Sequence, residues 1–205
     1  MLIAKQSYQK REAKLFEFAS WLWNTGLSER EVIAALNCAY EFTEQGRFGD
    51  VIKITKRLLT QKSISTQARR ELLALRAEAP WQLGYRQSAL RDLGKAISMP
   101  SDSRLRRNAS RTKLLAKRSD FSLAAGDFHS ALVDCNSIVI DDSASDVERL
   151  TAVYRRGLAR IGLSDPTGGK KDLTQFIATR SKDDDAELVH LRESAIERLG
   201  QLAAN

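Results

Sequence analysis

Apolar residues recur every three or four positions along most of the chain, and no segment alternates apolar and polar residues for long. This periodicity predicts amphipathic α-helices and no β-strands. Ser28, followed three residues later by Glu31, has the spacing of a capping box at a helix start. The expected helices cover residues 6–23, 28–45, 51–59, 69–83, 88–99, 105–125, 128–140, 147–163, 173–180 and a last segment from 183 onward.

Four related turns join these helices in pairs. The turns lie at residues 45–51, 83–89, 125–131 and, more loosely, 166–172. In the first three, a Gly stands five residues before the small or aliphatic residue that opens the next apolar run, which is Val51, Ala89 or Ala131. An internal repeat of this kind indicates an array of helix pairs.

Small residues also recur inside the first helix of each pair. Ala39, Ala77 and Ser119 each lie 12 residues before Val51, Ala89 and Ala131, respectively. Small side chains at paired positions let two helix backbones approach closely. For the fourth pair we expect Gly157 and Asp172 at these positions, with a loop over residues 164–169. The resulting anchors are 38, 42 and 41 residues apart.

This arrangement of small residues, turn glycines and aromatic residues after the turn (Phe48 and Phe128) resembles the tetratricopeptide repeat. The resemblance covers about residues 31–180 and is divergent, because the repeats here are longer than the usual period of roughly 34 residues. It implies an all-α fold, namely a right-handed superhelical array of antiparallel helix pairs, an α-solenoid.

The expected organisation has three parts. Residues 1–27 form an N-terminal capping helix, residues 28–182 form the repeats, and residues 183–205 form a C-terminal capping helix. The four repeats cover about residues 28–65, 66–103, 104–145 and 146–182. The aromatic residues of the first segment either complete the core at that end or form part of a partner site.

In tetratricopeptide proteins, the first helices of successive repeats line a concave groove that binds peptides. Carried over to this chain, the resemblance implies a groove that is apolar at one end and basic toward the other. Its partner-binding residues are Ile33, Leu36, Asn37, Tyr40, Trp81, Lys113, Lys117, Tyr154 and Arg155. Such a groove suits a protein or peptide with apolar and acidic residues. We therefore expect a chaperone-like adaptor or scaffold for protein–protein interaction.

The net charge of +7 adds a second hypothesis. Basic residues crowd the predicted helix over residues 104–118. Such a helix face is usually solvated or ion-paired within the protein, but it can also bind an acidic protein or follow nucleic-acid phosphates. The candidate contacts to phosphates or to an acidic partner are Arg104, Arg106, Arg107, Arg111 and Arg118. No aromatic residue interrupts this stripe to stack on bases, so nucleic acid ranks below a protein partner.

Enzymatic chemistry finds little support in the sequence. His129 and His190 lack a nearby nucleophile and acid at catalytic spacing, so we expect no enzyme, no cofactor and no metal. Cys38 and Cys135 lie inside apolar helical patterns, which suits a reducing compartment. No apolar stretch approaches the roughly 18 residues of a membrane-spanning helix. We therefore expect a cytoplasmic protein that does not contact membranes.

Overall fold

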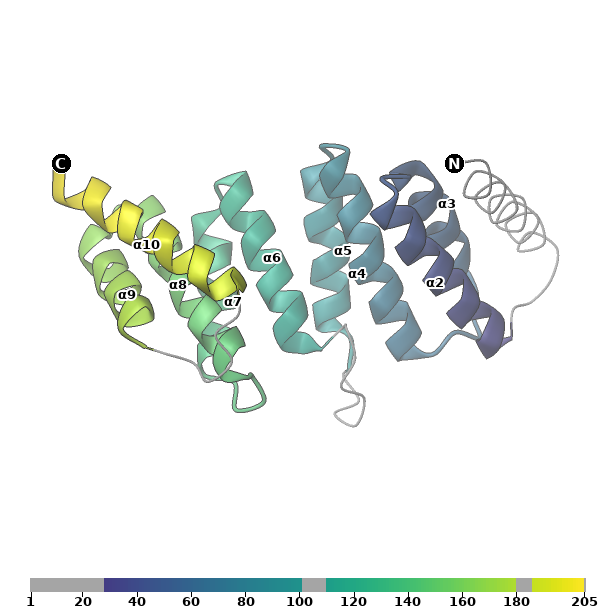
Figure 1. Ribbon diagram of the computed structural model, residues 1–205. Coiled ribbons are helices and arrows are strands. Elements are labelled where there is room, and N and C mark those ends of the chain that lie inside the picture. The colour runs from purple at the N-terminus through teal and green to yellow at the C-terminus, as the bar shows by residue number, and fades with distance from the viewer. Residues whose placement is uncertain (1–27, 101–109, 180–185, 205) are drawn as a thin grey trace. The chain divides into compact units, whose positions relative to one another are not determined.

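The computed structural model describes residues 28–100, 110–179 and 186–204 (Figure 1). Within these ranges every regular element is an α-helix, as the apolar periodicity predicts. The helices are α2 (Glu29–Glu44), α3 (Phe48–Leu59), α4 (Thr66–Gln82), α5 (Arg86–Ser98), α6 (Arg111–Ala125), α7 (Phe128–Val139), α8 (Asp146–Gly162), α9 (Pro166–Ala178) and α10 (Ala186–Ala204).

The chain divides into two compact units, with the boundary between Asp92 and Leu93, inside α5. In the first unit α3 packs against both α2 and α4, which also touch each other. In the second unit each helix from α6 to α10 packs against the next, and α8 additionally contacts α6 and α10. Consecutive helices therefore pack in chain order within each unit, as expected for an array of helix pairs.

The helices bury the apolar stripes from which they were predicted. In the first unit, one core joins Ala39 and Phe42 of α2, Val51 and Leu58 of α3, and Leu72 of α4. The second unit has one core under α6, α7 and α8 and another between α8, α9 and α10. Each core draws residues from three successive helices, so no helix pair buries its apolar surface alone.

Each helix pair is joined by a turn that contains one residue in the left-handed backbone region. The four residues are Gly46 (φ 70°), Gly84 (φ 82°), Gly126 (φ 78°) and Ser164 (φ 63°). The next N–H after this residue closes the turn, as when Arg47 donates to the Phe42 carbonyl at 2.8 Å. This bond satisfies a carbonyl that the end of the helix leaves open.

The fourth turn differs from the prediction, because its second helix begins earlier than expected. Residues 164–169 are not a loop, because α9 begins at Pro166 and its N-cap Asp165 accepts a hydrogen bond from the Gly168 N–H at 2.8 Å. Gly169 packs against Gly157, where an added Cβ would lie 2.9 Å from the Gly157 carbonyl oxygen. Gly169, rather than Asp172, therefore holds the fourth anchor position, and the anchors are 38, 42 and 38 residues apart.

Three helix pairs share an ion pair that the periodicity of the sequence did not reveal. An Arg of the first helix donates from Nε and Nη2 to both carboxylate oxygens of an Asp 16 residues later, over 2.5–2.9 Å. The pairs are Arg76–Asp92, Arg118–Asp134 and Arg156–Asp172. Their Asp residues are 4%, 1% and 1% exposed, so each carboxylate needs a cationic partner, and Asp172 also binds Arg160 at 2.9 Å. The first pair of helices has Cys38 and Ile54 at these positions.

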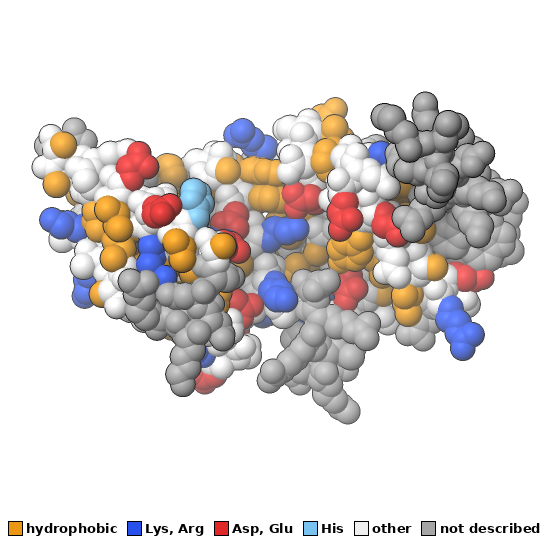
Figure 2. Space-filling view, in the orientation of Figure 1, with side chains coloured by type: hydrophobic (Ala, Val, Ile, Leu, Met, Phe, Trp, Pro, Cys, Tyr) orange, Lys and Arg blue, Asp and Glu red, His pale blue; other side chains and the backbone are white. Residues whose placement is uncertain are grey.

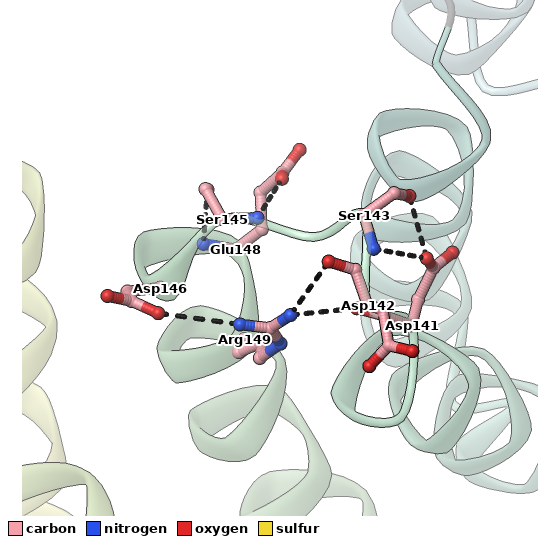
Figure 3. Close-up of polar contacts among 7 residues, drawn as sticks. All are labelled: Asp141, Asp142, Ser143, Ser145, Asp146, Glu148 and Arg149. Atoms are coloured by element: carbon pink, nitrogen blue, oxygen red, sulfur yellow. Dashed lines mark hydrogen bonds and ion pairs between the residues drawn. The ribbon is translucent and has the colours of Figure 1, made fainter. Parts of the chain in front are cut away.

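The polar segment between α7 and α8 is an ordered junction (Figure 3). The guanidinium of Arg149 donates to the carbonyls of Asp141 and Asp142, each at 3.1 Å, and so ties the start of α8 to the end of α7. Ser145 and Glu148 form a capping box at the start of α8. Arg69 plays the same part between α3 and α4, where it donates to the carbonyls of Leu59 and Gln61.

The last helix does not repeat the pattern of α8. Ala152 and Ala159 of α8 are fully buried, but the residues 38 positions later are His190 and Glu197, which are exposed. α10 instead packs through a stripe that includes Leu188 and Ala195. A polar outer face is typical of the helix that terminates a repeat array.

Candidate protein-binding surface on the first helices

The first helices α2, α4, α6 and α8 carry the residues that sequence analysis assigned to a groove. We call their residues at these positions the first-helix face. Each unit contributes two of these helices, and they contact each other in both units, α2 with α4 and α6 with α8. The face is therefore described separately for each unit.

In the first unit, the predicted residues differ in exposure. Ile33 is 49% exposed and Asn37 is also exposed, whereas Tyr40 is half-buried against the core. Leu36 is 6% exposed and belongs to that core, because it lies on the stripe of α2 that faces its neighbours. Leu36 therefore stabilises the fold and offers little surface to a partner.

The α4 part of this face is acidic and aromatic. Glu71, Glu78 and Trp81 are half-buried, and the guanidinium of Arg86 lies 5.6 Å from the centre of the Trp81 ring. Figure 2 shows acidic side chains over α2 and α4. The repeat register assigns Glu71 and Glu78 to the groove, so they add negative charge to the end that was described as apolar.

In the second unit, α6 supplies the cations. Lys113 is exposed and Lys117 is half-buried, one turn apart on the same side of the helix. Basic side chains over α6 are visible in Figure 2. The chain thus carries acidic residues on the first-helix face of one unit and basic residues on that of the other.

Arg155 of α8 is bound within the protein. Its guanidinium donates to both carboxylate oxygens of Asp120 on α6, with the Nη2–Oδ2 bond at 2.7 Å. Burial raises the pKa of the Asp120 carboxyl, the positive charge of Arg155 opposes that rise, and the nearby carboxylate of Glu187 adds to it. Arg155 therefore cross-links two first helices, and its charge is largely neutralised.

Tyr154 is covered by the last helix. Its side chain is 7% exposed, and its hydroxyl forms a 2.9 Å hydrogen bond with the hydroxyl of Ser194 on α10. Its ring also lies 5.2 Å from that of Phe176. The structure thus places Tyr154 in a core, because α10 packs over the position that sequence analysis left open to a partner.

Of the proposed phosphate contacts, the structure describes Arg111 and Arg118. Arg104, Arg106 and Arg107 lie outside the described residues. Arg111 is exposed at the start of α6, but Arg118 is engaged by Asp134, which raises the pKa of its guanidinium. Within the described part of α6, the exposed cations suited to phosphates are therefore Arg111 and Lys113.

The residues considered for catalysis are scattered. His129 lies in the first turn of α7 and is exposed, whereas His190 lies on α10 with Nδ1 3.9 Å from a carboxylate oxygen of Glu193. Burial raises the pKa of the Cys135 thiol to about 12, which suppresses its nucleophilic form. Among the described residues, no group of three His, Cys, Asp or Glu side chains is placed to hold a metal ion.

Comparison with protein families, curated proteins and solved structures finds no match to this chain. None of the helices that the structure describes is both long and apolar enough to span a membrane. Conclusions about function therefore rest on the chain's own surfaces.

Proposed function

We propose that the chain is a non-enzymatic scaffold of tetratricopeptide-like helix pairs, arranged as a right-handed superhelix, that binds a protein or peptide through its first-helix face. The observation that carries this proposal is the cationic surface of α6, formed by Lys113 and Lys117 beside the Arg155–Asp120 cross-link. The cross-link holds α6 and α8 together, so the cations are presented on a rigid support.

The partner that fits this surface of the second unit has acidic residues for Lys113 and Lys117. Electrostatic complementarity of this kind raises association rates and selects among partners more than it raises affinity. An adaptor, which binds without changing its partner chemically, needs no more than such a surface.

The decisive experiment exchanges the charge of α6. A partner is first isolated from native lysate on the immobilised protein, with and without nuclease treatment and at two salt concentrations. Its affinity is then measured for purified variants. The Lys113→Glu/Lys117→Glu double variant is expected to bind the partner at least about tenfold more weakly, the loss typical of binding hot spots. Its circular dichroism should match that of the original protein, because both side chains face away from the cores.

A matched control reverses the same amount of charge on a second helix. Lys170 and Lys171 are exposed on α9, and the Lys170→Glu/Lys171→Glu variant is expected to keep the partner affinity within about twofold, because surface substitutions away from an interface have small effects. Equal losses of partner affinity in both variants would show that binding depends only on the net charge of the protein. Recovery of nucleic acid instead of protein, lost steeply with rising salt, would replace this proposal with the nucleic-acid alternative.

A further inference from the structure

The last helix lies on the first-helix face of the second unit (Figure 1). α10 packs against α9 and α8, and its residue Ser194 bonds the hydroxyl of Tyr154, a residue that the repeat pattern assigns to the groove. The first turn of α10 also reaches α6 electrostatically, since Glu187 acts on the carboxyl of Asp120. A segment of the chain itself therefore covers this part of the face.

α10 is seated through one side only. Leu188 and Ala195 are 1% and 0% exposed, and Leu191 and Leu199 pack half-buried beside them. The opposite side is open to solvent, with Val189 49% and Ile196 58% exposed. This is the mode in which an amphipathic helix lies in the groove of a partner, with apolar anchors three, four and seven residues apart.

The fit of α10 is imperfect at its N-terminal end. Glu187 brings a carboxylate toward Asp120, which already has its pKa raised by burial. The Glu187 carboxylate repels that of Asp120, which Arg155 attracts more strongly and Lys117 less strongly. A helix with an uncharged residue in place of Glu187 would make the same apolar contacts without this repulsion.

We propose that the surface formed by α8 and α9 is a docking groove for an amphipathic helix of a partner protein, and that α10 is the resident occupant that this helix replaces. The partner helix has the apolar spacing of Leu188, Leu191, Ala195 and Leu199, a hydroxyl at the position of Ser194 to bond Tyr154, and an uncharged residue toward Asp120. This inference rests on the proposed function as a protein-binding scaffold and gives its partner a chemical class.

The test uses the full chain and the peptide of its own residues 186–204, labelled with fluorescein. In the full-length Leu188→Asp variant, a charge in the apolar contact releases α10 and opens the groove. This variant is expected to bind the peptide at least about tenfold more tightly than the original protein does, since the competing occupant is removed. Val189→Asp, which places the same charge on the exposed side of α10, is the matched control and should behave like the original protein.

Two further arms test the chemistry of the contact. A peptide with Glu187→Gln should bind the Leu188→Asp protein more tightly than the unchanged peptide, because the repulsion from Asp120 is gone. Amide hydrogen exchange on the Leu188→Asp and the milder Leu188→Ala variants should show faster exchange in α10 and unchanged protection in α8 and α9.

Three results would overturn the proposal. One is equal peptide binding by the Leu188→Asp and Val189→Asp proteins. Another is loss of protection throughout α8 and α9 in both Leu188 variants, since α10 would then be a fixed part of the core. The third is tighter binding of the unchanged peptide than of the Glu187→Gln peptide. This test needs no external partner. Its failure would therefore not decide the outcome of the Lys113 and Lys117 experiment.

Discussion

At the scale of single residues, the repeated Arg–Asp pair is the feature that helical periodicity concealed. Arg118 was assigned to a basic stripe because it lies among other cations, but its guanidinium binds Asp134 through both carboxylate oxygens. The partner lies 16 residues away on the next helix, beyond the reach of any three- or four-residue pattern. The available signal was the recurrence of Arg and Asp at this separation in three successive repeats.

Removing the carboxylate of one pair should cost considerable stability. Asp134→Ala leaves the partly buried Arg118 without its partner, and the free energy of unfolding is expected to fall by about 3 kcal/mol, as for other broken buried pairs. Denaturant titration followed by circular dichroism measures the change. Asp146→Ala is the control, because Asp146 bonds Arg149 from a side chain that is 85% exposed. That variant should lose less than about 1 kcal/mol, and similar losses in the two variants would contradict the argument.

At the scale of elements, the sequence predicts the helices well and one turn poorly. Three turns were predictable from their glycines, Gly46, Gly84 and Gly126, because glycine readily takes the left-handed backbone conformation. The fourth turn has Ser164 at that position, so the nearby Gly168 and Gly169 were interpreted as the loop. Those two residues lie in the first turn of α9, and Gly169 is needed for close packing against Gly157.

Ser164 therefore offers a stabilising substitution. Its φ of 63° strains a side chain that carries a Cβ, so Ser164→Gly is expected to raise the free energy of unfolding by about 1 kcal/mol. The midpoint of chemical denaturation measures the gain. Gly126→Ser, the reverse exchange at the equivalent turn, should lose a similar amount. A destabilised Ser164→Gly protein would show that the serine side chain contributes more than the strain removes.

The candidate site was predictable only in part, because it depends on how one helix packs on another. The repeat register assigned Lys113 and Lys117 to a binding surface of α6, where Lys113 is exposed and Lys117 is half-buried. It gave no sign that α10 packs over Tyr154, because that contact joins residues 40 positions apart through a helix outside the repeat pattern. Whether a residue is buried depends on which helix packs over it, and the repeat register does not specify that helix.

At the scale of the whole molecule, helices α2 to α4 and helices α6 to α10 pack in chain order within their own units, so stability should be distributed along each unit. Leu58 and Ile138 occupy equivalent positions in different units, and both are fully buried. Leu58→Ala should cost about 2–5 kcal/mol. Amide exchange is expected to quicken in α2, α3 and α4 and to remain unchanged in α8, α9 and α10. Ile138→Ala should quicken exchange in α6, α7 and α8 and leave α2, α3 and α4 unchanged. Uniform loss of protection in either variant would indicate a single cooperative unit.

The three Arg–Asp pairs also bear on how the chain assembles correctly. Arg76–Asp92 and Arg118–Asp134 each fix the alignment of two helices, because a slip by one turn would leave a buried carboxylate without its Arg. Asp172 also binds Arg160, one turn beyond Arg156, at 2.9 Å. The pairs share one chemistry, however, so the Arg of one repeat can also donate to the Asp of another repeat or of a second molecule. The short turn between the two helices of a pair favours the correct partner, because it keeps the correct Asp only 16 residues from its Arg. At high protein concentration, the Asp residues of neighbouring molecules compete with the one in the same chain. Refolding under this condition should therefore exchange helix hairpins between chains.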